Sequence, residues 1–507
     1  MNTNSRTKNT VINITVSVVC QIIMLILSFI VRTFFIKLLG ADYLGVNGLF
    51  SNILSILSMA DLGIGAAITF ALYKPIAEND EKKIQAYMNF FKLIYRIIAG
   101  IVFVLGCLCI PFLGYLINLS EEIPNLTLIY ILQLLSTTAS YICIYKSTLL
   151  IADQRTFITK IINALGVIIA DILELLILIA THNYFGYLIM QLVSTIITNI
   201  ITSVVADRMY PFLKRNDARL PIKEKKKLFS GIKAMIIYRI AGVILNATDN
   251  ILISILISTT VVGIYSNYTM ISGTINSFAT LVDESLKGSI GSLTTEKNIE
   301  NSRKNFKTLS LFNFWLYGFI AICLLILLND FIALWLGKDF LLSKITVIAI
   351  VLNIYVPGSL MIVANFRDTT GIYMKTKYVY VFASIINLIL SIVLGMEFGL
   401  SGIIFATSIS RLVTSGWYEP WVLYKDYFKI SVADFYLLQI RNFFILIISF
   451  IIVFFITKLI PTGSILLFMV KLSVCVVLVN VLFFLFFYQK EEFNDLLARI
   501  RKLSVYK

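Results

Sequence analysis

Residues 32–74 read RTFFIKLLGADYLGVNGLFSNILSILSMADLGIGAAITFALYK, and this stretch is the most informative part of the sequence about its helices. The pattern predicts an apolar helix, a short turn at 40–45 that contains glycine and aspartate, and a second long apolar helix. Arg32 and Asp61 lie within these hydrocarbon-length segments. Because charges are costly in lipid, each is a candidate functional residue.

The stretch has a weak echo 218 residues later, over 249–287, which reads DNILISILISTTVVGIYSNYTMISGTINSFATLVDESLK. A shift of 218 places Leu44-Gly45-Val46 on Val262-Gly263-Ile264 and Phe50 on Tyr268. The order of helix, turn and helix is also the same. We therefore predict an internal repeat.

The composition indicates a membrane protein. The chain has 507 residues, of which 59% are apolar and 14% are charged, and its mean hydropathy is +0.89. Soluble domains carry about 25% charged residues. Continuous apolar runs of 18 or more residues recur along the whole chain, and such runs are typical of membrane-spanning helices. The predicted fold is an all-α polytopic membrane protein with almost no soluble domain.

We predict fourteen spans from these runs. Their bounds are 12–37, 45–72, 90–116, 126–149, 158–180, 186–206, 234–257, 262–286, 308–329, 345–365, 378–396, 400–422, 441–459 and 464–487.

The basic residues predict the orientation. With a cytoplasmic N-terminus, 35 of the 43 Lys and Arg residues fall in cytoplasmic segments and 4 fall in outside segments. The remaining 4 lie within the predicted spans. The positive-inside rule therefore places both termini in the cytoplasm. The net charge of +15 then favours binding to anionic lipids. Nucleic-acid binding is not expected, because the basic residues are scattered over eight segments.

The spans and the repeat predict the domain organisation. Residues 1–206 form an N-terminal six-helix bundle, 207–233 a basic cytoplasmic linker and 234–425 a C-terminal six-helix bundle. Spans 13 and 14 occupy 426–488, and 489–507 form a cytoplasmic amphipathic tail. Because each bundle has an even number of spans, the repeats are parallel, with the substrate site between the halves.

Common catalytic and cofactor motifs are missing from the sequence. All six cysteines lie in apolar runs, which is typical of buried thiols rather than disulfides or a metal site. The single His182 lies in a short connection. The sequence contains no phosphate-binding loop of the G-x-x-x-x-G-K-[ST] type. We expect no cofactor, and any active step would use an ion gradient, the membrane potential or a substrate gradient.

The opening stretch LLGADYLGVNGLFSNILSILSMADLGIGAAI resembles the polysaccharide transporters of the MOP superfamily (multidrug, oligosaccharidyl-lipid, polysaccharide). Three further features resemble these transporters: Asp249-Asn250 followed by VVGIYSNYTMI, the basic loop after six spans, and the fourteen-span plan. The resemblance is closest to Wzx-type flippases. It implies a V-shaped pair of six-helix bundles around a central cavity.

The resemblance implies a transporter rather than an enzyme. Its substrate would be an undecaprenyl-diphosphate-linked oligosaccharide, moved to the outer leaflet of a bacterial plasma membrane by alternating access. The repeat units would serve O-antigen, capsule or exopolysaccharide assembly, with a polysaccharide polymerase and glycosyltransferases as further partners. The alternative is a cation-coupled multidrug exporter of the same superfamily. An enzyme is disfavoured because the predicted outside loops are short.

Intramembrane arginines are the candidate diphosphate ligands, because a guanidinium binds phosphate oxygens bidentately. They are Arg32, Arg239 and Arg411. In the resembling lipid II flippases an arginine in a VRD-like motif stands in the place of Arg32, although here Thr33 replaces the acid. The alternatives are snorkelling of Arg32 and Arg239, and for Arg411 a structural pair with Glu419 or Asp171.

Further candidates are polar residues near the turns and intramembrane acids. Asn47, Asn250 and Tyr265 are candidate sugar ligands. Candidates for proton or sodium coupling, or for static pairing, are Asp61, Asp249, Asp171 and Glu174. Asp171 and Glu174 are three residues apart and so share a helix face. Pro357 predicts a kink in span 10, either as a hinge or as a static bend.

Overall fold

The computed structural model describes residues 3–58, 64–119, 123–214, 218–226, 228, 242, 247–295, 298–376 and 378–505. The chain forms two compact units, Met1–Gly263 and Ile264–Lys507. The division lies C-terminal to the segment 207–233, where the sequence places its linker. The predicted repeat boundaries at 206 and 234 stay a prediction.

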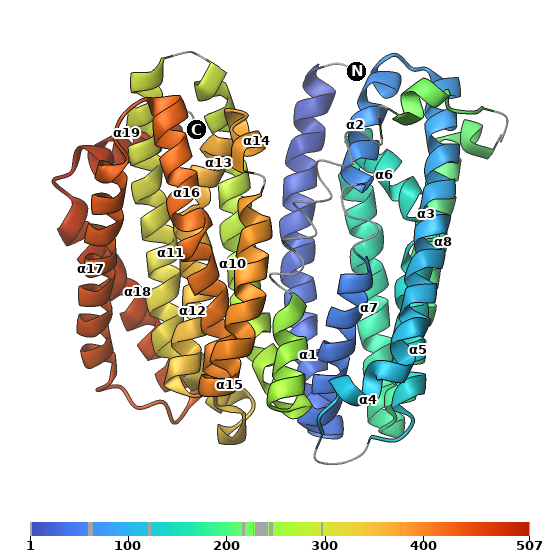
Figure 1. Ribbon diagram of the computed structural model, residues 1–507, viewed down its shortest axis with the longest axis horizontal. Helices are drawn as coiled ribbons and strands as arrows, with labels where there is room; N and C mark the ends of the chain where they lie inside the picture. The colour runs from blue at the N-terminus through green and yellow to red at the C-terminus, as the bar shows by residue number, and fades with distance from the viewer. Residues whose placement is uncertain are drawn as a thin grey trace. The chain divides into compact units, whose positions relative to one another are not determined.

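The described part of the first unit is built from α-helices joined by short connections (Figure 1). Their bounds are α1 Thr3–Leu57, α2 Ile64–Ala77, α3 Glu81–Cys109, α4 Leu113–Leu116, α5 Leu126–Ser140, α6 Ile144–Ala152, α7 Thr156–Thr181 and α8 Tyr184–Met209.

Helix α1 contains the predicted turn between spans 1 and 2. Two helical segments meet at a kink in this region, at Gly40, whose φ of 86° and ψ of −179° are not helical. Glycine adopts this positive φ without a steric penalty, so one residue is enough to bend the chain. The turn predicted at 40–45 is therefore present at Gly40, where two helical segments meet at a kink.

Residues 247–263 pack on the first unit, which explains why the division follows Gly263. The Ser254 hydroxyl donates to the carbonyl of Leu116 at 2.7 Å. The backbone amide of Thr259 donates to the carbonyl of Asn118 at 2.7 Å, and the Asn118 amide donates to the Thr259 hydroxyl at 2.9 Å. These bonds attach the residues before α10 (Thr259–Thr295) to the end of α4.

The contact between 41–45 and 259–263 joins positions related by the 218-residue shift. A Cβ on Gly45 would collide with the carbonyl oxygen of Thr259, and a Cβ on Gly263 with that of Ala41. The Thr260 hydroxyl donates to the carboxylate of Asp42, and these residues are also 218 apart. Residues that are equivalent under the predicted repeat thus meet reciprocally, and glycine allows the close approach of the two backbones.

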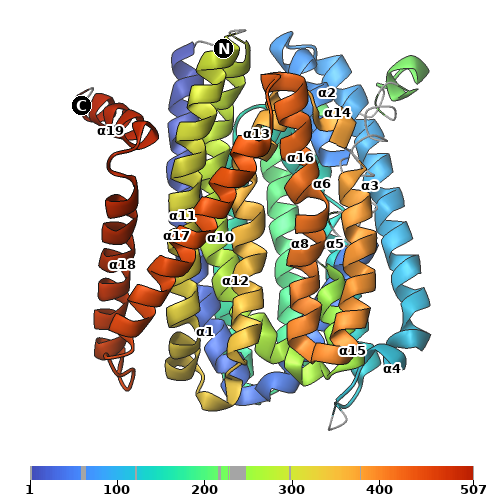
Figure 2. The same ribbon diagram turned by 60° about the vertical axis from the view of Figure 1, so that its left-hand side comes forward.

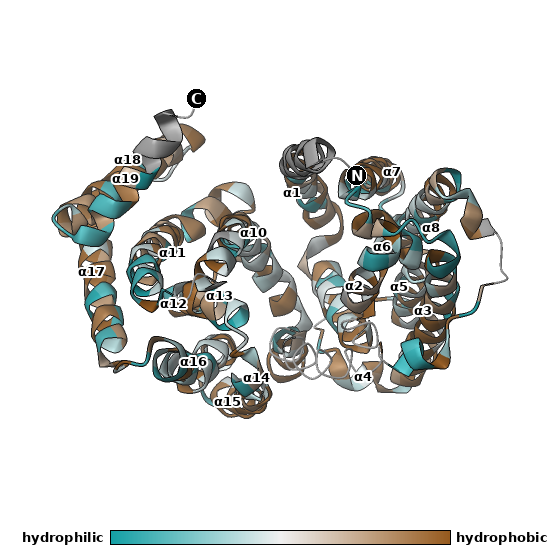
Figure 3. Ribbon diagram, turned by 90° about the horizontal axis from the view of Figure 1, so that it is seen from above, coloured by the Kyte–Doolittle hydropathy of each residue, from teal (hydrophilic) through white to brown (hydrophobic). Residues whose placement is uncertain are grey.

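The second unit contains the rest of α10 and nine further described α-helices (Figure 2). Their bounds are α11 Ile299–Trp335, α12 Lys344–Ser359, α13 Met361–Thr369, α14 Tyr373–Thr376, α15 Val379–Val413, α16 Ser415–Leu423, α17 Ala433–Thr457, α18 Ile465–Phe487 and α19 Glu491–Val505. Viewed along the helices in Figure 3, α17 and α18 lie together at one edge of this unit.

Two predicted features of the second unit occur as backbone bends. Gly399, with φ 59° and ψ −138°, bends α15 between predicted spans 11 and 12. Predicted span 10 is divided into α12 and α13 directly after Pro357 and Gly358. The Asn313 side chain donates to the Gly358 carbonyl at 2.6 Å, which anchors this break to α11.

The C-terminal segment forms the predicted helix, and this helix packs on α11. Phe493 is buried and stacks on Trp315 at 5.7 Å between ring centroids. The Thr308 hydroxyl donates to Asp495 at 3.0 Å. Burial alone would raise the pKa of Asp495, but hydrogen bonds from Thr308 and Arg499 outweigh it and hold the pKa below its usual value. Helix α19 is therefore docked by both apolar and ionic contacts.

Ten segments of the described chain are long and apolar enough to cross a membrane, which makes this a multi-pass membrane protein. Two of them contain the glycine bends. Val19–Leu57 covers most of predicted span 1 and the first part of span 2, and Tyr373–Phe428 covers predicted spans 11 and 12. Half of predicted span 7 lies outside the described residues. Span 8 corresponds to α10, which is absent from the ten. The number fourteen stays a prediction.

We predict that Gly45→Ala and Gly263→Ala each destabilise the protein, because the added methyl would meet a backbone carbonyl. Overpacking costs about 1–3 kcal/mol, against a helix-propensity gain of about 1 kcal/mol. Thermal unfolding in detergent measures the net loss.

Gly100→Ala is the matched control, because no described atom outside the adjacent backbone of α3 lies within 4 Å of the place that the added methyl would take. It should be neutral or slightly stabilising. Equal midpoints for all three variants would contradict the close approach.

Candidate functional site

A polar cavity of about 440 Å³ lies within the first unit, between α1, α5 and α8. Its lining is Asn47, Ser51, Leu54, Ser55, Ser58, Gln133, Ser136, Thr137, Ser140, Tyr141, Gln191 and Thr195. Leu54 is the one apolar residue in this lining, and the lining contains no Asp, Glu, Lys or Arg. A neutral, hydrogen-bonding cavity therefore lies within an apolar helical unit.

Helical spacing places these residues on shared faces. On α1, Asn47, Ser51 and Ser58 follow the spacing i, i+4 and i+11. On α5, Gln133 and Thr137 are four residues apart, and Ser136 lies one turn from Gln133 on the same face. Each helix thus directs a polar stripe at the cavity, while its exposed apolar residues lie on other faces.

Several cavity hydroxyls donate their hydrogen to their own helix. Thr137 donates to the carbonyl of Gln133 at 2.9 Å, Ser58 to that of Leu54 at 2.7 Å, and Thr195 to that of Gln191 at 2.8 Å. A hydroxyl oxygen has two acceptor sites in addition to its one donor. These side chains are therefore suited to accept hydrogen bonds from a hydroxylated ligand.

One end of the cavity is fixed by an amide and phenol cluster. The Gln133 side-chain amide donates to Asn47 Oδ1 at 2.8 Å, and the Tyr184 hydroxyl donates to the same oxygen at 3.0 Å. Gln133 is 5% exposed, and its Oε1 has no hydrogen-bond partner among the described residues. A buried amide oxygen of this kind is a strong acceptor site for a ligand.

The predicted charged residues Arg32, Asp171 and Glu174 come together near this cluster. The Tyr187 hydroxyl of α8 lies beside the Glu174 carboxylate of α7. Arg32 of α1 lies near Tyr187, and Asp171 lies near Glu174. Three helices therefore bring one cation, one phenol and two acids into one neighbourhood.

Aromatic rings connect the charged group to the cavity. Tyr184 stacks on Tyr187 at 5.9 Å between ring centroids, and both rings meet Phe35 edge-on at 5.5 and 5.4 Å. Tyr43 packs against Tyr184 at 5.3 Å. Because Tyr184 also bonds to Asn47, the charged group and the cavity form one continuous site, which we call the Asn47–Arg32 site.

The remaining predicted residues lie elsewhere. Asp249 and Asn250 belong to the apolar helix Ala247–Leu256 and do not line the cavity. Tyr265 on α10 and Arg411 on α15 belong to the second unit. Arg239 and Asp61 lie outside the described residues. Lys37 is exposed whereas Arg32 is half-buried, so the two cations differ in environment.

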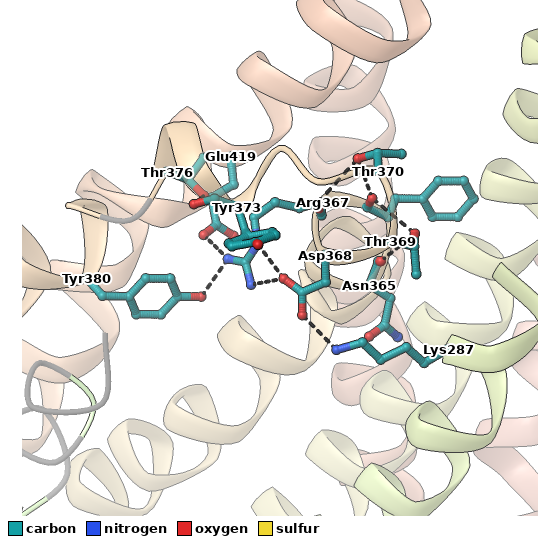
Figure 4. A network of polar contacts seen from close by, with 11 residues as sticks. Lys287, Asn365, Arg367, Asp368, Thr369, Thr370, Tyr373, Thr376, Tyr380 and Glu419 are labelled. Carbon is teal, nitrogen blue, oxygen red and sulfur yellow. Dashed lines mark hydrogen bonds and ion pairs between the residues drawn. The ribbon is translucent and has the colours of Figure 1, made fainter. Parts of the chain in front are cut away.

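The second unit contains a buried ionic network on α10, α13, α15 and α16 (Figure 4). Arg367 donates to Glu419, to the Tyr380 hydroxyl at 3.1 Å and to Asp368 at 2.7 and 3.0 Å. Lys287 pairs with Asp368 at 2.7 Å. Arg367 and Glu419 are 3% and 2% exposed. The cation is enclosed by its partners, which indicates a structural role.

This network bears on Glu419, one of the two acids considered as a structural partner of Arg411. Glu419 pairs with Arg367, which sequence analysis had left in a cytoplasmic connection. The reason is the break after Pro357, because α13 turns Arg367 into the unit instead of ending the span there. Sequence analysis also missed Gln133 and Ser136, although polar residues at helical spacing within 126–149 were the available signal.

The family model for "polysaccharide biosynthesis protein" matches residues 10–283, more than half of the chain. The chain belongs to the polysaccharide biosynthesis protein family. The matched range contains the whole Asn47–Arg32 site. No curated protein matches the sequence. The family predicted from sequence is thereby confirmed.

Solved structures show the same fold. The chain is similar to the lipid II flippase MurJ in an inward closed conformation, with 18% identity, 93% of this chain and 98% of that chain covered, and TM-score 0.63. It is also similar to an inward-facing MATE multidrug transporter of the MOP superfamily, with 12% identity, 80% and 96% coverage and TM-score 0.60. A third similar structure is that of the Vibrio cholerae MATE transporter VcmN. The identity is 14%, the match covers 82% of this chain and 96% of that chain, and the TM-score is 0.55. The MOP-superfamily fold is thus established.

We predict that Arg367→Ala strongly destabilises the second unit. Removing one partner of a buried pair leaves Glu419 uncompensated, at a cost of about 3–5 kcal/mol. The double variant Arg367→Met with Glu419→Met should be more stable than the single one, because no buried charge remains. Thermal unfolding of the purified variants measures both.

An exposed pair supplies the control. Lys74 and Glu78 are 3.7 Å apart on the surface of α2, and Lys74→Ala should change stability by less than about 1 kcal/mol. A double variant no more stable than Arg367→Ala would show that the network does not act through charge burial.

Proposed function

We propose that this protein is a flippase for lipid-linked oligosaccharides. In this proposal it moves an undecaprenyl-diphosphate-linked repeat unit from the cytoplasmic to the outer leaflet by alternating access. The product would serve assembly of a cell-surface polysaccharide such as O-antigen, capsule or exopolysaccharide. Membership of the polysaccharide biosynthesis family and the fold shared with a lipid II flippase support this substrate class.

The neutral polar cavity is the observation that carries the proposal. A sugar presents hydroxyl groups that both donate and accept hydrogen bonds, and it carries no charge of its own. Rows of Ser and Thr oxygens, together with the buried Oε1 of Gln133, offer acceptors. The aromatic rings of Tyr184 and Tyr187 lie at the same site. This chemistry fits the glycan of the substrate.

Arg32 is the proposed ligand of the diphosphate. Its guanidinium has five N–H donors in a planar fork, so it binds two phosphate oxygens while other donors contact the protein. The Tyr187 hydroxyl lies beside the carboxylate of Glu174, the acid in the neighbourhood of Arg32. The aromatic layer between Arg32 and Asn47 then separates the diphosphate end from the sugar end of the substrate.

The alternative function is cation-coupled multidrug export, which the likeness to MATE transporters raises. A site for cationic drugs needs acids within its cavity. The described lining of the polar cavity contains none, which favours the sugar substrate. Asp171 and Glu174 lie beside the cavity and are the residues such an exporter would use.

The remaining features of the proposal concern energy, location and partners. Proton or sodium coupling through Asp61, Asp249, Asp171 or Glu174 is proposed, since the sequence has no phosphate-binding loop. The proposed location is a bacterial plasma membrane with both termini cytoplasmic, from the distribution of basic residues. Glycosyltransferases would supply the substrate, and a polysaccharide polymerase would consume the translocated product. The protein itself is proposed to be a transporter without a catalytic centre.

We predict that proteoliposomes with purified protein translocate a polyprenyl-diphosphate oligosaccharide but do not export a cationic dye. Arg32→Gln should abolish most of the sugar movement, because it removes the phosphate-binding charge. A protected-substrate assay follows the sugar, and fluorescence follows the dye. Dye export without sugar movement would contradict the proposed function, whereas sugar movement unaffected by Arg32→Gln would discard only the role of Arg32.

We predict that Gln133→Leu lowers the rate of sugar translocation roughly tenfold or more, since a lost buried hydrogen bond costs about 1–3 kcal/mol. Asn199→Leu is the matched control. Asn199 on α8 donates to the Ala139 carbonyl of α5 at 3.2 Å but does not line the cavity. If both variants lowered the rate of sugar translocation equally and had equal thermal stability, a specific role of Gln133 would be contradicted.

A further inference from the structure

A second cavity, of about 340 Å³, lies in the second unit where α11, α17 and α19 meet. Lys307 of α11, Arg441 of α17 and Glu492 of α19 contribute to its lining. This cavity has charged groups of both signs, unlike the neutral cavity of the first unit. It plays no part in the proposed transport step.

The cations of this cavity lie at the level where the helices enter the membrane. Arg303 and Asp434, near the starts of α11 and α17, are paired at 3.8 Å and so lie side by side. Lys307 lies one helical turn further along α11, and Arg441 about two turns further along α17. Predicted spans 9 and 13 begin at 308 and 441, and these starts would place both cations at headgroup depth.

Within the described chain, no salt bridge engages Lys307, Arg441 or Glu492. Arg441 donates to Asn442 Oδ1 at 3.2 Å, and its guanidinium lies 5.6 Å from the ring centroid of Phe487. These contacts orient Arg441 without neutralising it. Asp434, the other acid of the lining, is paired with Arg303.

Apolar surface continues from the cavity along α17. Leu437 lines the cavity and is 64% exposed. Ile440 and Phe444 follow it at helical spacing and are also exposed. The site therefore joins a charged pocket at headgroup level to an apolar track directed into the membrane, which is the profile of a phospholipid.

We propose that this cavity binds a phospholipid of the cytoplasmic leaflet whose headgroup carries both a phosphate and a primary amine. Lys307 and Arg441 bind the phosphate, and the ammonium group donates to the Glu492 carboxylate. The acyl chains lie along α17. Two cations and one acid without a salt-bridge partner in the described chain match a zwitterionic headgroup better than a purely anionic one.

Binding would link three elements. Helix α19 already docks on α11, because Asp495 accepts from Thr308 at 3.0 Å and Arg499 donates to the side-chain oxygen of Asn305. A lipid that contacts Glu492 and Lys307 strengthens this docking, and its contact with Arg441 adds α17. The lipid is thus proposed to be a structural ligand of the C-terminal helices.

Native mass spectrometry of the full-length protein tests the proposal with three lipids of identical acyl chains. The lipids are phosphatidylethanolamine, phosphatidylglycerol and phosphatidylcholine. We expect several-fold greater retention of phosphatidylethanolamine than of the other two. The variant Lys307→Gln with Arg441→Gln should lose retention of phosphatidylethanolamine and phosphatidylglycerol alike. Glu492→Gln should remove the preference for phosphatidylethanolamine and keep phosphatidylglycerol binding.

Lys458→Gln, at the opposite end of α17 and exposed, is the control and should bind like the wild type. Thermal unfolding without added lipid checks that the variants fold. Equal retention of all three lipids, or unchanged binding by the double variant, would overturn the site. Greater retention of phosphatidylglycerol with no effect of Glu492→Gln would overturn the amine contact. Displacement by equimolar inorganic phosphate would show that the site binds free phosphate instead.

Discussion

A polar group inside the hydrocarbon core must find a partner within the protein or face a wet cavity, and this constraint governs the structure. Lys471 illustrates the first solution, because it is buried and pairs with Asp330 at 2.6 Å. Arg367 and Glu419 illustrate it again. The Ser, Thr and Gln residues of the first unit follow the second solution, since their stripes converge on a cavity. The constraint thus distinguishes charges that stabilise the fold from polar residues available to a ligand.

The internal repeat has a physical expression at one contact. Gly45 and Gly263 are equivalent under the 218-residue shift, and each packs against the backbone beside the other. A side chain at either position would separate the two segments. The same segments carry Asp42 and Thr260, which are also equivalent and share a hydrogen bond. The two segments share few residues, but both have glycine where their backbones approach closely, at Gly45 and Gly263.

The sequence predicted the all-α fold correctly, because long apolar runs have few other stable structures. It also predicted that Asp171 and Glu174 share a face, and that Asn47 borders a polar site. It did not identify the partner helices. Gln133 meets Asn47 across 86 positions, and Arg367 meets Glu419 across 52. Helical periodicity specifies the face of a residue but not the helix that covers it, so Arg367 was predicted in a connection and Glu419 was considered only as one alternative partner of Arg411.

The central claim is that the glycan of a lipid-linked substrate occupies the neutral cavity of the first unit. Site-directed labelling tests it most directly, with Ser136→Cys in a variant whose six native cysteines are replaced by serine or alanine. The labelling rate of this thiol by a small polar reagent is measured with and without ligand. Polyprenyl-diphosphate oligosaccharide should protect the thiol, and the same polyprenyl diphosphate without sugar should not. Equal protection by both lipids, or protection by neither, would contradict the account.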